Sequence, residues 1–503
     1  MPDQNTSFPT EEPPAAPFGQ VGPVSPPQPL VQPMVESAQS GVTPPVVPAL
    51  PTETVQGAPV SSSPKRRFPI KIILVILVLL ILGVAGFFGF QFLKNRVPVA
   101  PLTQNTISWW GLWEDSSIVE PLIAEYEAQN PNAQIEYVQQ SPKDYRERLE
   151  SSLAKGDGPD IFFFHNSWAP MFKDRLDKIP AGTMSAGEFA ETFYPVSASD
   201  VTSGTGLVGI PLGYDAITLY INQDIFDAAG KTSPTTWDEL REIAQDLTTR
   251  DDEGLITQAG VALGLTKNVD HWPEILALMM LQNGAKLAEP EGDEAEKALE
   301  FYTLFAGGDG VWDENMPTST VAFAAGKVAM IFGPSWRAFE IKEQNPNLRF
   351  KAVNPPHLPK EDPNEPDIGY ATYWIQGVWE GSSQKDEAWK FLKYMSEAQT
   401  LEKLYGNASK LRLFGEPYPR VDMADLLISH PLLGGIVSQG PTAVSWYLAD
   451  RTFDGPTGIN SQINKYYEDA VNAVNDGADA KVALATTAKG VAQILAQFGI
   501  TSP

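Results

Sequence analysis

The longest uninterrupted apolar pattern in this 503-residue chain covers residues 72–93, IILVILVLLILGVAGFFGFQFL, and contains no charge. About 20 such residues cross the roughly 30 Å hydrocarbon core of a membrane as a helix. A buried helix of a globular protein would show a polar face, which this pattern lacks. A cleaved signal peptide would have a shorter apolar region that ends in small residues, whereas this one ends in phenylalanines. The pattern predicts an uncleaved transmembrane signal anchor over residues 68–96.

The basic residues around this apolar segment predict its orientation. Four precede it and two follow it: Lys65, Arg66, Arg67 and Lys71, then Lys94 and Arg96. The more basic flank of a membrane span stays in the cytoplasm. We therefore expect a single-pass protein of the cell membrane with a cytoplasmic N-terminus. Residues 97–503 would then form an extracellular or periplasmic domain.

Residues 1–67 show neither helical nor strand periodicity. The first 64 residues contain 16 prolines and no Lys or Arg. Such a sequence favours extended polyproline conformations and buries too little apolar surface to offset the entropy of folding. We predict a disordered, Pro-rich cytoplasmic tail over 1–67. It is either a docking segment for a partner or an inert solvated tail.

From residue 105 the apolar pattern alternates between strand and helix periods. TISWWGLW predicts a strand, and the helix after it has Ser116 or Ser117 as its cap. AQIEYVQQ predicts a second strand, and the next helix ends at Gly156. PDIFFFH is apolar almost throughout, which is typical of a central strand. This regular alternation predicts a mostly parallel sheet covered by helices.

The later part of the chain continues with helices and strands. TTWDELREIAQDL predicts an amphipathic helix that opens with a capping box of Thr236 and Glu239. STVAFAAGKVAMIFG predicts a helix, a break at Gly326 and a strand. KDEAWKFLKYMSEAQTLEKLYG predicts one long helix that ends at Gly406, and the last 45 residues read as helical.

The charge and the missing cysteines exclude several classes of partner and site. The formal net charge is -26, and the excess of acid follows residue 96, because residues 1–96 hold five acidic and six basic residues. Such a surface repels nucleic acid and anionic lipid. The chain has no Cys, so thiolate zinc sites, cysteine nucleophiles and a lipid-modified N-terminal cysteine are excluded. The predicted span would supply the tether to the membrane instead.

No catalytic signature occurs in the chain. G-x-S-x-G, H-E-x-x-H, a Walker loop and a G-x-G-x-x-G motif after a strand are all missing. The four histidines are scattered without the spacing of metal ligands. Glu114 and Asp115 resemble a glycosidase pair only in composition, because adjacent carboxylates seldom face one gap. We predict no catalytic residue, no metal and no cofactor, and hence a protein that is not an enzyme.

Tryptophan is the residue type that carries the functional hypothesis. Trp237 and Trp389 lie within amphipathic helices and Trp109 within the first strand, so core packing is expected for these three. Six others stand at strand ends, in loops or at helix starts, close to polar residues: Trp113, Trp168, Trp272, Trp336, Trp374 and Trp446. Flat indole faces suit sugar rings, and neighbouring polar groups bind hydroxyls. Core packing is the alternative for each.

Five segments resemble, in order, the extracellular solute-binding proteins of ABC importers, in particular their sugar-binding, maltose-type group. They are LAKGDGPDIFFFHNSWAPMFKDRLDKI, GIPLGYDAITLYINQDIF with TTWDEL, AFAAGKVAMIFGPSWRAFEIK, DIGYATYWIQGVWEGSSQKDEAWKFLKYM and AVSWYLADRTF. The resemblance covers 105–500. It implies an α/β, two-lobed, periplasmic-binding-protein-like (type II) clamshell. Lobe 1 would hold about 105–213 and 355–405, and lobe 2 about 214–354 and 406–503.

The resemblance also implies a function. The chain would capture a small solute, a sugar or oligosaccharide, in the cleft between the lobes and deliver it to the permease of an ABC transporter. The ligand-contacting residues carried over by position are Trp113, Glu114, Phe164, Asn166, Tyr214, Asp215, Trp272, Trp336, Trp374 and Trp446. Arg412 would lie near the cleft or form a surface ion pair.

Two departures from the maltose type limit what the resemblance implies about the solute. Phe164 stands where that group carries a binding tryptophan, and an extra serine in GPSW shifts Trp336 by one place. Maltodextrin specificity is therefore not implied, and a polyol or a glycerophosphodiester stays open. A surface sensor or adhesin with the same clamshell, and a carbohydrate-active enzyme, are the alternative functions.

Overall fold

The computed structural model describes residues 105–360 and 365–500. The predicted tail and signal anchor lie outside these residues, so both stay predictions. Within the two described ranges, none of the helices is long and apolar enough to span a membrane.

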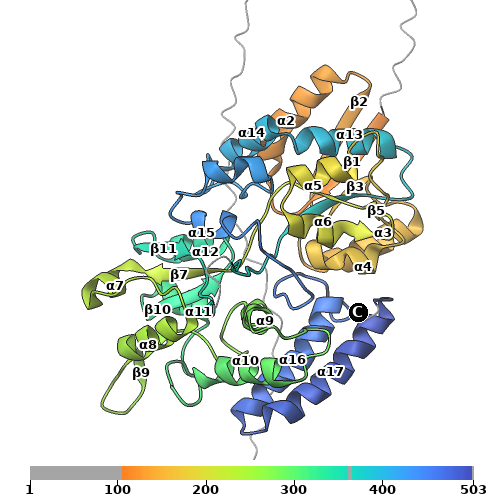
Figure 1. The fold of residues 1–503 in the computed structure, drawn as a ribbon. Coiled ribbons are helices and arrows are strands. Elements are labelled where there is room, and N and C mark those ends of the chain that lie inside the picture. The colour runs from red at the N-terminus through yellow and green to blue at the C-terminus, as the bar shows by residue number, and fades with distance from the viewer. Residues whose placement is uncertain (1–104, 361–364, 501–503) are drawn as a thin grey trace, which may run out of the picture. The chain divides into compact units, whose positions relative to one another are not determined.

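The first of two five-stranded sheets has the strand order β2-β1-β3-β12-β6. Its strands are β1 (Asn105–Gly111), β2 (Ala133–Gln139), β3 (Ile161–His165), β6 (Ile210–Pro211) and β12 (Trp374–Val378). β1 pairs in parallel with β2 and β3, whereas β12 is antiparallel to β3 and β6. Helices α2 (Ser116–Gln129) and α3 (Tyr145–Lys155) connect the parallel strands (Figure 1). The predicted alternation is confirmed here, and β3 is buried along its whole length. The prediction of a mostly parallel sheet is wrong, because β12, which comes back from the second sheet, pairs antiparallel on both sides.

Local sequence explains where these helices begin and end. The side chain of Asp115 accepts a hydrogen bond from the backbone N–H of Ser117 (2.9 Å), so Asp115 is the cap of α2 and not one of the serines. Its carboxylate satisfies an N–H group that has no partner within the helix. α3 ends at Gly156, as predicted, where φ is 82°. Glycine reaches this left-handed conformation without the steric cost of a side chain.

The second sheet has the order β11-β7-β10-β9-β8. Its strands are β7 (Thr218–Asn222), β8 (Thr249–Arg250), β9 (Ile256–Val261), β10 (Val328–Gly333) and β11 (Phe350–Val353). β7 is antiparallel to its neighbours β10 and β11, while β9 and β10 are parallel. Every residue of β7 and β10 is buried. The capping box of Thr236 and Glu239 opens α8 (Trp237–Leu247), as predicted.

Three passages of the chain join the two sheets. The first runs between β6 and β7, and the second between β11 and β12. The third leaves α14 (Ala398–Ala408), which packs on α2, and reaches α15 (Gly434–Val437), which packs on β11. In Figure 1 the first sheet lies at the upper right and the second at the lower left. This is the two-lobed α/β architecture that the resemblance implies, while the residue limits of the lobes stay a prediction.

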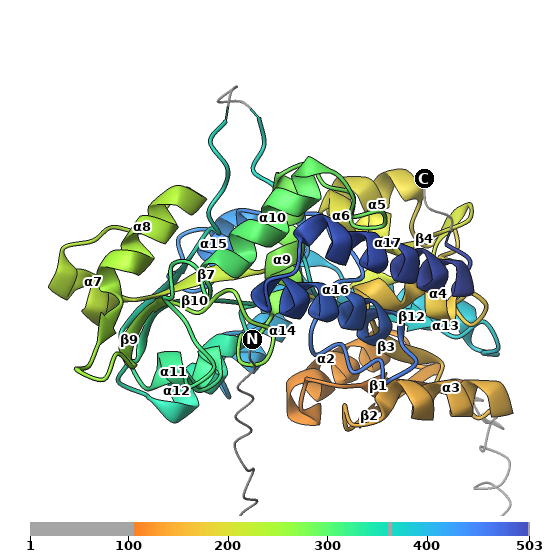
Figure 2. The same cartoon turned by 90° about the horizontal axis from the view of Figure 1, so that it is seen from below.

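The C-terminal helices α16 (Ile459–Asn475) and α17 (Ala480–Gln497) pack against each other. Both contact α10 (Asp293–Leu304), and α16 also contacts the short helix η1 (Asn166–Trp168), which follows β3. Figure 2 shows the pair lying between α10 and α4 (Ala169–Phe172). The C-terminal helices therefore contact η1, which follows a strand of the first sheet, and α10, which follows a strand of the second sheet.

One predicted helix is wrong. The segment expected as one helix to Gly406 forms α13 (Lys385–Met395) and α14, and α14 runs through Gly406 to Ala408. Glu397 leaves the helical region with ψ at 144°, and the carbonyl of Ser396 accepts a hydrogen bond from Arg420 (3.2 Å). Neither Gly nor Pro stands at this break, so local propensity gives no sign of it.

Nine further helices and strands complete the fold of the described residues. They are α5 (Ala186–Thr192), α6 (Pro195–Val201), β4 (Thr202–Ser203), β5 (Gly206–Leu207), α7 (Gln223–Ala229), α9 (Trp272–Gln282), α11 (Ser319–Ala324), α12 (Arg337–Gln344) and η2 (Val421–Leu426).

Candidate functional site

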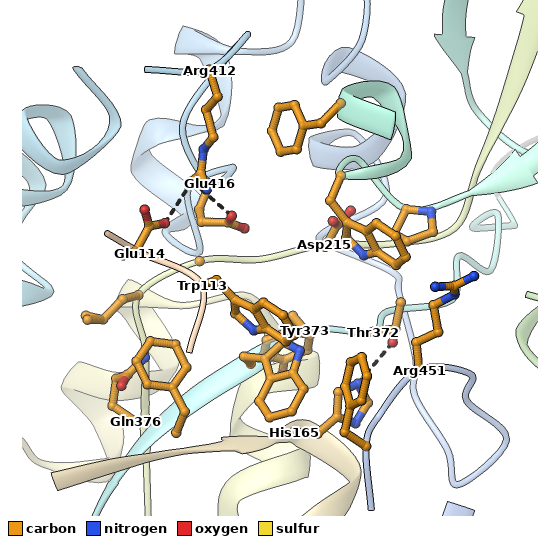
Figure 3. Close-up of a pocket in the computed structure, with 18 of the residues that line it drawn as sticks. Trp113, Glu114, His165, Asp215, Thr372, Tyr373, Gln376, Arg412, Glu416 and Arg451 are labelled. Atoms are coloured by element: carbon orange, nitrogen blue, oxygen red, sulfur yellow. Dashed lines mark hydrogen bonds and ion pairs between the residues drawn. The ribbon is translucent and has the colours of Figure 1, made fainter. Parts of the chain in front are cut away.

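A cavity of about 330 Å³ is bounded by strands of the first sheet, by segments that follow strands of the second sheet, and by the passages between the sheets. The first sheet contributes Trp109, Phe163, His165, Trp374 and Gln376. The segment that follows β10 in the second sheet contributes Pro334, Trp336, Phe339 and Glu340. Figure 3 shows the side chains that converge on this space. Its size lies at the lower end of the range for small-molecule sites.

Aromatic rings form much of the cavity wall. Trp113 follows β1, and its ring lies 5.4 Å from that of Trp374, the first residue of β12, with the planes inclined by 70°. The ring of Phe453 lies 5.8 Å from that of Trp113. The edge-to-face pair of Trp113 and Trp374 and the tilted pair of Trp113 and Phe453 pack these three rings against one another. The wall is therefore rigid as well as apolar.

Trp336 is held by a buried chain of polar groups. Its ring contacts the edge of His271 (5.4 Å between centroids) and the guanidinium of Arg337 (4.4 Å from the ring centroid). Arg337 donates from Nε to His271 Nε2 (2.8 Å), so the ring proton of His271 sits on Nδ1, 3.5 Å from Glu274 Oε1. Burial, with the charge of Arg337, lowers the pKa of His271 to about 3. The imidazole is therefore neutral. Oε1 of Glu274 also accepts a hydrogen bond from the backbone N–H of Asp450 (2.7 Å).

Two carboxylates and one guanidinium form a polar end of the cavity. Arg412 Nη2 lies 2.7 Å from Glu114 Oε1 and 3.2 Å from Glu416 Oε1 (Figure 3). Glu114 is 6% exposed, and its other oxygen, Oε2, is buried with no hydrogen-bond partner among the described residues. Burial and the charge of Glu416 raise the pKa of Glu114 to about 7, against the opposing effect of Arg412. Arg412 thus forms an ion pair and lines the cavity at once.

Asp215 lies on the first passage between the sheets, and its carboxylate is already occupied. Oδ1 accepts from the backbone N–H of Ala216 (2.8 Å) and of Ser335 (2.9 Å), and Oδ2 accepts from the Ser335 hydroxyl (2.7 Å). Burial raises the pKa of Asp215 to about 7, although these donors favour the charged form. Asp215 lines the cavity, but its bonds tie the passage to the segment that carries Trp336.

Two of the predicted ligand contacts, Phe164 and Asn166, lie behind the cavity wall. Phe164 is fully buried, and its ring fills the space beside Gly209 and Gly377. Phe163 and His165 line the cavity because successive side chains of β3 point to opposite faces. Asn166 donates to Asp200 (3.0 Å), which is also bound by Tyr373.

Three more predicted ligand contacts do not line the cavity, namely Tyr214, Trp272 and Trp446. Tyr214 is buried against Tyr194, with 4.8 Å between the rings. Trp272 begins α9 next to the lining residue His271 and is half-buried. Trp446 packs on Tyr447 (5.4 Å) and Tyr467 (6.4 Å). The structure thus brings five predicted residues together around the cavity, namely Trp113, Glu114, Asp215, Trp336 and Trp374. Their contact with a ligand stays a prediction.

Several residues that line the cavity were not predicted from the sequence. Gln376 is a polar residue in the apolar segment YWIQGVW and is 1% exposed, with its Oε1 accepting from Trp109 Nε1 (3.3 Å). That polarity was a signal that could have found it. Glu416, Arg451 and Phe453 gave no such signal. Arg451 and Phe453 both have positive φ, 53° and 55°, a conformation that costs a non-glycine residue energy and that only the surrounding structure imposes.

The acidic side chains of the described residues do not form a metal site. In the ranges 105–360 and 365–500, no group of three His, Asp or Glu residues lies close enough together to hold a metal ion. The carboxylates around the cavity are instead bound by arginines and by N–H and O–H donors.

Comparisons with known proteins identify relatives of this chain. The sequence profile of the family described as bacterial extracellular solute-binding protein matches residues 110–401. A putative binding protein of Brucella abortus is 24% identical over 288 residues, which is 54% of this chain and 66% of that protein, just under two thirds of its length. The multiple sugar-binding protein of Streptococcus mutans is 23% identical over 58% of this chain and 71% of its own length.

The solved structures agree on the fold. An ABC transporter solute-binding protein from Thermotoga lettingae, bound with α-D-tagatose, superposes with a TM-score of 0.58. It covers 78% of this chain and 99% of its own length at 22% sequence identity. At this identity the likeness confirms the predicted two-lobed fold and carries nothing about the solute.

Proposed function

The chain belongs to the bacterial extracellular solute-binding protein family, and from that premise we propose that it binds a sugar or short oligosaccharide in the cavity lined by Trp113, Trp336 and Trp374. The observation that carries the proposal is the combination of rigid indole rings with a polar end formed by Glu114 and Arg412. Sugars offer apolar ring faces for stacking and hydroxyls for charge-assisted hydrogen bonds.

The size of the cavity supports a short ligand. Its volume of about 330 Å³ equals that of about eleven water molecules in the liquid. That is room for about one or two sugar rings. The relatives that match over most of their length include a multiple sugar-binding protein and a protein bound with tagatose, which supports a carbohydrate solute for this chain.

The proposal extends to transport and to the membrane. The bound solute would pass to the permease subunits of an ABC transporter, as the family assignment suggests. The apolar segment 72–93 would anchor the domain at the outer face of the cell membrane, since its length and flanking charges fit a span. The matched family and its structural neighbours are binding proteins, so capture without chemical change of the sugar is the proposed activity.

A ligand screen tests the binding step. The full chain is purified in detergent and mixed with a panel of monosaccharides and disaccharides, and both the melting temperature and the tryptophan fluorescence are recorded. We expect at least one sugar to raise the melting temperature, because a ligand that binds only the folded state stabilises it. The same sugar should change the fluorescence, since four lining residues of the cavity are tryptophans. A panel in which nothing binds contradicts the proposal.

Uptake measurements test the transport step. A strain that lacks the gene should lose uptake of the sugar that binds in the screen. Unchanged uptake, with binding intact, would favour a sensor or adhesin with the same fold. Appearance of cleaved sugar in the binding assay would instead favour a carbohydrate-active enzyme.

A further inference from the structure

The walls of the cavity carry more carboxylates than guanidinium groups. Five acidic side chains line it, Glu114, Asp215, Glu340, Glu416 and Asp450, against two basic ones, Arg412 and Arg451. The lining histidines His165 and His271 do not change this balance, because burial lowers the pKa of each to about 3. With Glu114 and Asp215 both counted as protonated, three acidic side chains remain in the lining against two guanidinium groups, and Arg337 behind the wall pairs with one of the three, Glu340.

Each guanidinium of the lining already has acidic partners. Arg412 lies between Glu114 and Glu416. Arg451 lies 3.5 Å from Asp270 and 3.7 Å from Asp450. Arg337, just behind the wall, pairs with Glu340 at 2.6 Å. The lining acids Glu340, Glu416 and Asp450 are about a third exposed, and each is paired with an arginine. Glu114, in contrast, is buried, and charges interact more strongly at a buried position than in solvent.

The polar end also contains a group without a partner. Glu114 Oε2 is buried and accepts no hydrogen bond from the described residues, while Glu114 Oε1 is bound to Arg412. A buried charged oxygen without a donor is costly. Burial raises the pKa of Glu114 to about 7, so one guanidinium shared by two carboxylates does not keep this group fully charged.

The aromatic walls are compatible with a positive charge. The face of an indole or phenyl ring attracts an ammonium group through its quadrupole. Trp113, Trp374 and Phe453 form a connected cluster of such rings in the same cavity. An ammonium would therefore meet carboxylates at the polar end and rings along the wall.

We propose that the solute of this cavity carries a protonated amine, so that an aminated sugar is preferred over the matching neutral sugar, with the amine at the end formed by Glu114, Arg412 and Glu416. This inference rests on the proposed sugar-binding function. The ammonium supplies the positive charge and the hydrogen-bond donors that Glu114 and Glu416 lack, while the rest of the sugar packs on the rings.

Matched pairs of sugars test the preference. The full chain in detergent is titrated with pairs that consist of a neutral sugar and its aminated partner. The pairs are glucose and glucosamine, galactose and galactosamine, mannose and mannosamine, and cellobiose and the disaccharide of glucosamine. The N-acetylated forms serve as neutral controls at the same position. We expect an aminated member to bind at least about tenfold more tightly than its neutral partners, and high salt to weaken it more.

A variant tests where the amine lies. Glu416 has a side chain that is 35% exposed, so Glu416→Gln removes one charge without emptying the core. It should weaken binding of the aminated sugar severalfold more than binding of the neutral sugar, and so reduce the preference. Glu402→Gln is the matched control, because Glu402 is exposed on α14 and does not line the cavity.

Each outcome decides between the two proposals. Tighter binding of a neutral sugar, or equal binding of both members, overturns the inference and leaves the proposed function standing. Failure of every sugar, neutral or aminated, overturns the proposed function and the inference together. A preference that Glu416→Gln does not change removes the amine from the polar end and overturns the assignment.

Discussion

At the scale of single residues, position relative to the cavity separates tryptophans of similar sequence context. Trp113 and Trp446 both stand in polar loops, yet only Trp113 lines the cavity. Trp446 packs against Tyr447 and Tyr467 instead. Substitution of Trp113 and of Trp446 should therefore have different effects, although the sequence predicted contact with the solute for both.

Trp113→Ala and Trp374→Ala should each weaken binding of the solute by about tenfold to a hundredfold. Loss of a large apolar contact costs about 1–3 kcal/mol. The measurement is a fluorescence or calorimetric titration with the sugar found in the screen. Trp446→Ala is the matched control, expected to lower the melting temperature while sparing affinity per folded molecule. Intact affinity in both cavity variants would show that these rings do not hold the solute.

Asp215→Asn should destabilise the fold as well as affect the site. The carboxylate accepts bonds from Ala216 and from the N–H and hydroxyl of Ser335, and an amide nitrogen in place of one oxygen can accept none of them. A buried donor left without its acceptor costs about 1–3 kcal/mol. Chemical denaturation measures the loss. A variant as stable as the parent would mean that these bonds add nothing to folding.

At the scale of elements, caps show how closely local sequence specifies structure. α8 opens with the reciprocal bonds of Thr236 and Glu239, and its buried face holds Trp237, Leu240 and Ala244. The break between α13 and α14 shows the opposite case, because it coincides with a bond from Arg420, which lies 24 residues further along the chain.

Thr236→Ala should lower the free energy of unfolding by about 1 kcal/mol, since it removes the side-chain acceptor of the N-cap. Thr236→Ser keeps the hydroxyl and should stay close to the parent. Urea denaturation of the two variants makes the comparison. Equal losses in both would point to the methyl group, and not to the cap, as the stabilising feature.

At the scale of the whole molecule, several buried acids act together on stability. Burial raises the pKa of Glu114, Asp215 and Glu274 to about 7 and that of Asp200 to about 6. An acid whose pKa is higher in the folded state holds more protons when folded, so stability falls as pH rises through the window between its unfolded and folded pKa. That window runs here from about pH 4 to about pH 7.

The free energy of unfolding should therefore be lower at pH 8 than at pH 5. Each unit of pKa shift corresponds to about 1.4 kcal/mol. His165 and His271, whose pKa values are lowered to about 3, act in the opposite direction because they take up protons only when the chain unfolds. Four acids with raised pKa outweigh two histidines, so the net loss should amount to at least about 1 kcal/mol. Denaturation curves at the two pH values measure it. Glu114→Gln cannot titrate and should reduce the dependence. A chain that is more stable at pH 8 would contradict the raised pKa values.

The arrangement of the chain in the membrane is the remaining whole-molecule prediction. Protease added to intact cells should digest residues 97–503 and leave the tail protected, because the more basic flank of the span lies on its N-terminal side. Immunoblots against either end of the protein read the result. A mature protein that begins near residue 90 would show that the segment is a cleaved signal.

Elements with local causes could be predicted from the amino-acid sequence alone. The strand and helix periods between residues 105 and 165, the stop at Gly156 and the capping box at Thr236 follow from neighbours a few residues apart. The order of five recognisable segments was enough to predict the two-lobed fold, because family segments keep their order along the chain. The sequence could not show that Phe164 points away from the cavity, because both faces of β3 are buried and its apolar pattern does not indicate which face borders the cavity.

The composition of the site, in contrast, depends on contacts between residues far apart in the sequence. Glu114 and Arg412 are 298 residues apart, and Asp215 and Ser335 are 120 apart. No period or motif links such positions, since their contact depends on how three passages of chain join two sheets. The same holds for Arg451 and Phe453, whose left-handed backbone is stabilised by contacts with Trp336 and Trp113. Local preference shapes the strands and helices, whereas long-range packing selects the side chains that meet in the cavity.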